Sequence, residues 1–437
     1  MRSSYVHTTG SIPETNELKL IDKYVDWYLF SLIGGMSQQN FGFNTLHQIT
    51  EDIKKYRIIL NNNDKKFIID SGGYSIIAGQ VSPRDVNKFI ECYSMFLEKD
   101  ALDNCSYIMS LDIPIFLKYP KNNTVKYIYE ANTKSISESV KILKKNPELY
   151  EKFVFVYQFK IPKQNKIWKQ IYDEQFRNDE NLRNFAIGGL VGLRGITNIK
   201  FSPFIAPAYR CLKHISDRNL DFRSLIHILG IYHYHDRTIL AFMNKLFDKY
   251  TEDEKFKTHI TYDTINYTLS GLYKLREQIV FIPEDDKYIY DYSYNLIDKI
   301  DRIIFDENIL KIIKTDLQKI LNNEQVNDVR ISSLINTITQ VIIDRIIIEE
   351  LEKNNILDLF IECKSFNIFK LKFRPILKML EQKYPPIFGG RTEKNLKNFQ
   401  FVYAMDDWWR NNRDETELEK LMEKFISLIG FPFDLQE

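Results

Sequence analysis

Short apolar runs rich in β-branched and aromatic residues recur along the first two thirds of the chain, and amphipathic segments separate most of them. Each run ends in polar residues or glycine, as strands do where a loop follows. The pattern predicts eight strands, at residues 28–32, 57–60, 67–69, 107–111, 153–157, 185–187, 226–229 and 259–262. It predicts helices at residues 45–55, 83–99, 133–144, 166–175, 207–218 and 236–249.

Eight strands alternating with helices indicate an α/β fold, and they favour a (β/α)8 TIM barrel over an open doubly wound sheet. The predicted barrel domain covers residues 1–278. One irregularity is the link 61–66 between the second and third predicted strands, which is too short for a helix. Long helical periodicities at 309–321 and 331–353 follow, so residues 279–437 are predicted to form a mainly helical C-terminal region.

Composition narrows the class of protein. The chain has 437 residues, of which 44% are hydrophobic and 27% charged, and this excludes disorder over most of its length. Sixty basic and 59 acidic residues give a net charge of +1, so a nucleic-acid site would have to be a local patch. The four scattered cysteines form no C-x-x-C pair, which is typical of reduced thiols. With no signal peptide and no run of about 18 apolar residues, we expect a cytoplasmic protein without a membrane partner.

Polar residues and glycines stand at the ends of the predicted strands. They are Asp70-Ser71-Gly72-Gly73-Tyr74, Asp112, Gln158, Gly188-Gly189-Leu190, Gly230 and Asp263, in chain order. In a barrel the carboxyl ends of all strands meet on one rim, where catalytic residues of this fold are found. The sequence therefore predicts three carboxylates, a glutamine and several glycines around one pocket.

The order of these motifs resembles the queuine/archaeosine transglycosylase family over about residues 34–276. Asp70 to Tyr74 is similar to the family's Asp-Ser-Gly-Gly-Phe/Tyr signature, and Gly188-Gly189-Leu190 is similar to its Gly-Gly-Leu stretch, although Gly192 follows one residue early. The resemblance implies that Asp70 is the general acid/base and Asp263 the nucleophile. It implies that the base is bound by Ser71, Gly73, Tyr74, Asp112, Gln158, Gly188, Gly189, Leu190 and Gly230.

Base exchange requires residues of these types. It cleaves a C1′–N bond through an oxocarbenium-like state, and a carboxylate such as Asp263 can attack C1′ and hold the sugar covalently. Asp70 would protonate the departing guanine and then deprotonate the incoming 7-deazaguanine. Asp112 can accept hydrogen bonds from the N1–H and amino group of guanine, and the Gly189 N–H can donate to O6.

The resemblance also bears on the substrate. The tRNA enzymes of the family hold zinc after the nucleophile with three cysteines and a histidine, but here no histidine follows Asp263 and Cys363 is the only cysteine. We therefore expect no metal and no cofactor. We expect a DNA-guanine transglycosylase like the family's phage and bacterial members, which exchanges guanine in DNA for a preQ0-type 7-deazaguanine, in the host cytoplasm if phage-encoded. The alternatives are a zinc-less tRNA-guanine transglycosylase and a non-catalytic nucleic-acid-binding subunit.

The expected partners are DNA, with tRNA as the alternative, and the free 7-deazaguanine base. Accessory DNA-modification proteins are further candidates. Basic and aromatic residues interleave at 160–169, 370–378 and 391–413, as in segments that bind single strands, although such runs also form solvated faces. The candidate nucleic-acid contacts are His233, His235, Arg237, Lys372 and Arg374. The His233–Asp236 cluster is also compatible with a metal-dependent hydrolase or with helix capping.

Overall fold

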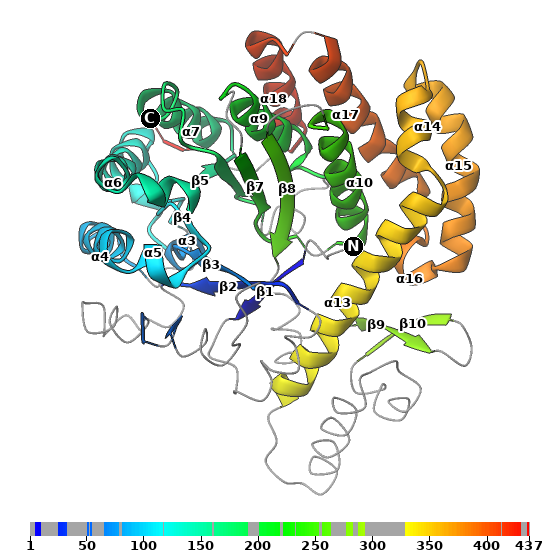
Figure 1. Cartoon of the computed structure of the whole chain (residues 1–437), viewed down its shortest axis with the longest axis horizontal. Coiled ribbons are helices and arrows are strands. Elements are labelled where there is room, and N and C mark those ends of the chain that lie inside the picture. Colours follow the sequence, from blue (N-terminus) through cyan, green and yellow to red (C-terminus); the bar gives the residue numbers. More distant parts are fainter. Residues whose placement is uncertain are drawn as a thin grey trace, which may run out of the picture.

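The chain was analysed as a computed structural model, shown in Figure 1. The structure describes residues 5–9, 25–32, 50–51, 53–54, 65–77, 81–116, 118–159, 161–190, 201–218, 222–231, 233–252, 256–263, 277–282, 287–292, 328–411, 413–429 and 435–436. These residues show a curled parallel sheet flanked by helices and followed by a helical C-terminal region.

The sheet is built from parallel strands that pair in chain order. They are β1 (Tyr5–Thr9), β2 (Trp27–Ser31), β3 (Lys66–Asp70), β4 (Tyr107–Met109), β5 (Phe153–Gln158), β6 (Asn184–Gly188), β7 (Phe222–Ile228) and β8 (Phe256–Asp263). The strands β2 to β8 curl as one continuous sheet, and β1 pairs with β2 on one side and with β8 on the other. No complete helix lies in the described residues between β1 and β3, so the strand–helix repeat is seen for only part of the chain.

Seven of the eight predicted strands are confirmed as β2 to β8. The remaining predicted strand, at residues 57–60, lies outside the described residues. In the sheet β2 pairs directly with β3, for example through Trp27 and Lys66, so no strand lies between them. Within this sheet, the strand that the sequence analysis missed is β1, because its sequence Tyr-Val-His-Thr-Thr carries little apolar signal.

Helices follow the later strands and cover the outer side of the sheet (Figure 1). They are α3 (Gly73–Ile77), α4 (Val86–Lys99), α5 (Ala101–Asn104), α6 (Val125–Lys145), α7 (Pro162–Gln175), α9 (Ile205–Ser216) and α10 (Tyr234–Tyr250), with 3-10 turns at Pro120–Asn122 and Pro147–Glu151. Helix α6 shows how the sequence sets such boundaries. The Thr124 hydroxyl accepts a hydrogen bond from the Tyr127 N–H, and Lys144 and Lys145 lie in the last turn, where the helix dipole favours cations.

Side chains of each strand alternate between two apolar layers. In β5, Phe153, Phe155 and Tyr157 pack outward against the helices, while Val154 and Val156 face the interior of the curled sheet. The interior cluster also contains Val6, Trp27, Leu29, Ile68, Met109, Ala186 and Leu225. The direction of the side chains in a strand repeats every two residues, so these apolar positions show which later residues of each strand face inward.

The C-terminal region begins with a hairpin rather than a helix. Strands β9 (Glu277–Ile282) and β10 (Lys287–Tyr292) pair antiparallel, so the predicted boundary at residue 278 falls inside β9. The helices that follow are α13 (Asp328–Lys353), α14 (Ile356–Glu362), α15 (Phe366–Lys383), α16 (Pro385–Phe388), α17 (Thr392–Asn411) and α18 (Glu415–Ile429). Within the part of the chain that the structure describes, no helix has the length and apolar character needed to cross a membrane.

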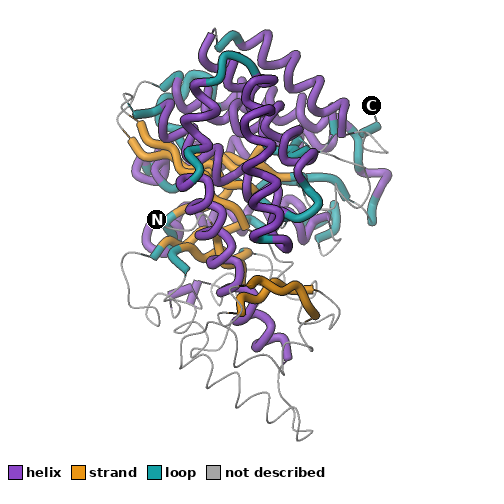
Figure 2. The backbone as a smooth tube through the Cα atoms, turned by 90° about the vertical axis from the view of Figure 1, so that its right-hand side faces the viewer, coloured by secondary structure: helices purple, strands orange, loops and turns teal. Residues whose placement is uncertain are grey.

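The C-terminal helices pack against the outer helices of the sheet, and Figure 2 views the molecule from the side that they cover. Phe242 of α10 contacts Phe360 and Phe399, with ring centroids 5.0 and 4.8 Å away. Residues of both regions belong to one continuous hydrophobic cluster. The C-terminal helices therefore extend the core of the sheet domain.

Candidate active site

Strand alternation brings the predicted site residues to one end of the sheet. Ile68, Val156 and Ala186 lie in the inner apolar layer, so the residues two positions further along face the same way. These residues are Asp70, Gln158 and Gly188, each at the last position of its strand. Asp263 ends β8, and Asp112 follows β4 closely. The carboxyl ends of these parallel strands form one rim, which we call the mouth.

Asp70 at the mouth carries an unusual carboxyl group. Burial, together with the negative charges of Asp112 and Asp263, raises its pKa from 3.8 to about 8, although the hydrogen bonds from the Gly72 and Ser71 N–H groups oppose the shift. The Gly72 N–H donates to Asp70 Oδ2 at 3.2 Å. At neutral pH this side chain therefore holds a proton that it can donate. Asp263, at the end of β8, is one of the two charges that contribute to this shift.

Asp112 is buried and held by two neighbours. The Ser71 hydroxyl donates to Oδ1 at 3.1 Å, and Gln158 Nε2 donates to Oδ2 at 2.5 Å. Burial raises the pKa of Asp112, and these two hydrogen bonds act against the rise. Gln158 Oε1 is buried and accepts no hydrogen bond within the described residues. An unpaired buried acceptor costs about 1–3 kcal/mol, so a donor from a bound ligand would stabilise it.

Two glycines allow these side chains to approach. A Cβ at Gly73 would lie 2.9 Å from both carboxylate oxygens of Asp112, and a Cβ at Gly188 would lie 2.3 Å from Gln158 Nε2. Neither position has room for a methyl group unless its neighbour moves. The glycine signals in the sequence thus mark close packing around the Asp112–Gln158 pair.

Asp263 is held by β7 and by the turn that follows it. The Gly230 N–H donates to Asp263 Oδ1 at 3.0 Å, and His227 Nε2 lies 3.3 Å from the same oxygen. Gly230 has φ +77°, a left-handed conformation that glycine adopts readily, and this directs its N–H at the carboxylate. Sequence analysis missed His227. The signal that could have found it is its position between Leu225 of β7 and Leu229 just after that strand, both of which pack in the inner apolar cluster.

The remaining predicted base-binding residues are described only in part. Gly189 follows β6 with φ +82°, and Leu190 is buried. Tyr74 lies in the short helix α3, but its side chain is outside the described residues, as is Gly192. A stacking role for Tyr74 therefore stays a prediction.

The predicted nucleic-acid contacts near β7 are mostly internal. Arg237 is 1% exposed, and its guanidinium binds the Asp344 carboxylate and Gln340 of α13. Its predicted contact with nucleic acid is wrong for this structure, because the side chain links α10 to the C-terminal region. His235 is also buried and lies 3.4 Å from Asp236, while His233 is half-buried and stacks on His235. These contacts agree better with the packing interpretation.

The predicted contacts in the C-terminal region lie on α15. Lys372 is exposed, and Arg374 is 42% exposed and bonded to Glu393 at 2.6 Å. Leu371, which precedes Lys372 in the same helix, is 76% exposed. These two basic residues are accessible, so their predicted contact with nucleic acid remains open.

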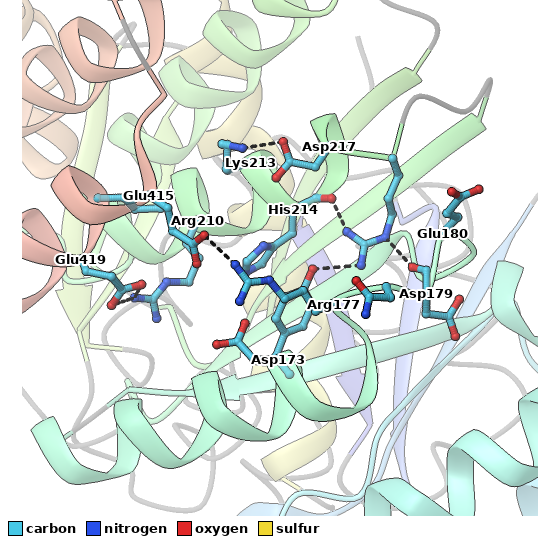
Figure 3. Close-up of a pocket in the computed structure, with 14 residues that line it drawn as sticks. Asp173, Arg177, Asp179, Glu180, Arg210, Lys213, His214, Asp217, Glu415 and Glu419 are labelled. Atoms are coloured by element: carbon cyan, nitrogen blue, oxygen red, sulfur yellow. Dashed lines mark hydrogen bonds and ion pairs between the residues drawn. The ribbon is translucent and has the colours of Figure 1, made fainter.

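A hollow of about 420 Å³, drawn in Figure 3, lies away from the mouth. It is lined by the end of α7, the end of α9 and the start of α18. Because α7 leads into β6 and α9 leads into β7, the hollow lies near the amino ends of these strands, opposite the mouth. Its charged side chains bind one another. Examples are Arg210 with Glu419 at 2.8 Å and Arg177 with Glu415 at 3.2 Å. We interpret this hollow as an ion-paired contact between α18 and the sheet domain.

Metal binding and similarity to known proteins were both considered for this site. In the part of the chain that the structure describes, no three His, Cys, Asp or Glu side chains are grouped closely enough to hold a metal ion. Searches against protein-family models and against curated proteins find no match for this chain. The site is therefore interpreted from its own geometry.

Proposed function

We propose that this chain is a DNA-guanine transglycosylase with a (β/α)8 barrel, which exchanges guanine in DNA for a preQ0-type 7-deazaguanine. One observation carries the proposal: Asp70, Asp112 and Asp263 lie at one mouth, and burial with the two neighbouring charges raises the pKa of Asp70 to about 8. A protonated carboxyl beside a second carboxylate is the arrangement that acid-assisted cleavage of a C1′–N bond requires. Such an enzyme would act in the cytoplasm.

The first displacement uses both catalytic carboxylates. Asp263 attacks C1′ of the target nucleotide, the C1′–N9 bond breaks, and its electron pair stays on guanine. Asp70 donates its proton to the departing base, which leaves as neutral guanine. The sugar is then bound to Asp263 through a C1′–O bond.

The second displacement reverses these roles. Asp70, now ionised, removes the N9 proton of the incoming 7-deazaguanine as the base attacks C1′. The C1′–O bond breaks, and its electron pair returns to the Asp263 carboxylate. Two inversions at C1′ retain the configuration of the nucleoside, and Asp70 ends protonated, ready for another cycle.

Base recognition is proposed for the Asp112–Gln158 pair. Asp112 would accept hydrogen bonds from the N1–H and amino group of a guanine-type base, a pattern that adenine does not present. Gln158 Oε1, which has no partner within the described residues, offers one further acceptor. The Gly189 N–H would donate to O6.

DNA is proposed as the polymer because the chain has no histidine after Asp263 and a single cysteine there, Cys363. The zinc site of the tRNA enzymes that the sequence resembles cannot be built from these residues. In a duplex the target guanine must first be flipped out of the stack, at a cost of a few kcal/mol.

The test is a base-exchange assay with radiolabelled guanine or preQ0, with DNA and tRNA in parallel. We expect label to enter DNA without added metal or nucleotide, and we expect Asp263→Asn to abolish the exchange. Label in tRNA alone would overturn the DNA assignment and retain the mechanism. No exchange into either polymer by the pure protein would contradict the proposal.

A further inference from the structure

His227 lies in the interior of the sheet, between the proposed nucleophile and a threonine of the next strand. Its side chain is 0% exposed. Nε2 lies 3.3 Å from Asp263 Oδ1, and Nδ1 lies 2.9 Å from the Thr261 hydroxyl. Thr261 and Asp263 are two residues apart on β8, so both face inward towards His227 on β7. The three side chains form a chain of hydrogen bonds that ends on the carboxylate.

The hydrogen-bond partners decide which ring nitrogen carries the proton. Asp263 Oδ1 is an acceptor, and it already receives the Gly230 N–H at 3.0 Å. A proton on Nε2 lets the ring donate to this oxygen, whereas a bare Nε2 would place a lone pair against a carboxylate. Nδ1 is then the acceptor, and the rotatable Thr261 hydroxyl can donate to it. Thr261 thereby selects the ring form that binds Asp263.

We propose that His227, with its ring form fixed by Thr261, is a positioning residue for the Asp263 nucleophile. This inference rests on the proposed function. Two donors on Oδ1 fix the rotation of the carboxylate about its Cβ–Cγ bond, and Oδ2 is then the oxygen that attacks C1′. When the second displacement breaks the C1′–O bond and returns the electron pair to Asp263, the Nε2–H stabilises the restored charge.

The first test compares variants of the two positioning residues in the base-exchange assay. His227→Leu removes the donor, and we expect kcat to fall by about 100-fold, with KM for DNA and for the free base changing much less. His227→Gln retains an N–H near the position of Nε2, so its kcat should be at least about ten-fold higher than that of His227→Leu. A Gln variant as impaired as the Leu variant would overturn the inference.

Thr261→Val tests the selection of the ring form. We expect Thr261→Val to lower kcat by about three- to ten-fold. In the double variant with His227→Leu this loss should not add to that of His227→Leu alone, because both changes interrupt the same chain of hydrogen bonds. The matched control is Thr258→Val, which removes the 2.8 Å contact between Thr258 and the Ser224 hydroxyl, earlier on the same two strands. Its kcat should equal that of the wild type. Additive losses for Thr261→Val and His227→Leu would contradict the proposal.

A spectroscopic readout separates this inference from the proposed function. Nitrogen-15 NMR of histidine-labelled protein identifies which ring nitrogen carries the proton, and the His227 signal is the one lost in His227→Gln. We expect the proton on Nε2 in the wild type and a changed signal in Thr261→Val. A protein that exchanges no base would refute the proposed function, whereas a proton on Nδ1 would refute the role of His227.

Discussion

Replacement of Asp70 by asparagine tests the environment of the proposed general acid. The variant has nearly the same shape, but its side chain does not titrate. In the wild type the folded protein holds the Asp70 proton up to about pH 8, because burial and the charges of Asp112 and Asp263 oppose ionisation. The unfolded chain loses that proton near the ordinary pKa of 3.8. Folding therefore takes up a proton between these two pH values.

The magnitude follows from the shift in pKa. A carboxyl whose pKa is raised on folding destabilises the protein progressively as pH rises from about 4 to about 8, by about 1.4 kcal/mol per pH unit. The cost is absent below that window and constant above it. At pH 7 it is on the order of 4 kcal/mol. Asp70→Asn removes the cost, so its stabilising effect should grow by roughly 4 kcal/mol between pH 5 and pH 8.

Thermal unfolding across this pH range measures the effect. For a chain of 437 residues, roughly 4 kcal/mol corresponds to a rise of roughly 4 °C in the melting temperature of the variant relative to the wild type. Base exchange should be lost in the same variant. A difference in melting temperature that does not change between pH 5 and pH 8 would refute the assignment of Asp70 as a protonated acid.

Four further predictions follow from the site and its support. Base exchange by the wild type should decline as pH rises above about 8, where Asp70 loses the proton it donates, and a rate that is flat to pH 10 would contradict this. Gly188→Ala places a Cβ 2.3 Å from Gln158 Nε2, so we expect a raised KM for the free base and a loss of about 1–3 kcal/mol in unfolding free energy, measured by kinetics and urea denaturation. Arg237→Met leaves the buried Asp344 without its cation and should lower the unfolding free energy by about 3–5 kcal/mol. The same substitution should cost less in a protein that already carries Asp344→Leu, and an equal cost in both backgrounds would argue against a buried ion pair. Treatment with a chelator should leave base exchange unchanged, whereas a loss of base exchange that added zinc restores would contradict a mechanism without metal.

The fold was predictable where the strands carry a strong apolar signal. Strands β2 to β8 have buried, β-branched and aromatic residues, and the predicted positions of their carboxyl ends placed Asp70, Gln158 and Asp263 at one mouth. β1 was not predicted because it is only weakly apolar. A strand of this kind is defined by its pairing with β2 and β8, and pairing is a long-range property that a local pattern does not contain.

The errors in the site have a similar origin. Arg237 looked like a phosphate contact because it follows a polar cluster, but Asp344, more than 100 residues later, buries it in an ion pair. His227 lies inside β7, whereas the polar and glycine pattern of the sequence marks residues at strand ends. Its importance comes from facing Thr261 and Asp263 across the sheet, which requires the register of β7 against β8.

The central claim is that Asp263 forms a covalent bond to C1′ of a nucleotide in DNA. The direct measurement is denaturing electrophoresis of the protein after incubation with labelled DNA and no incoming base, followed by mass spectrometry of the modified peptide. We predict a DNA–protein adduct on Asp263 that disappears in Asp263→Ala, and its release when a 7-deazaguanine is added. Base exchange that proceeds with Asp263→Ala, or an adduct on another residue, would contradict the account.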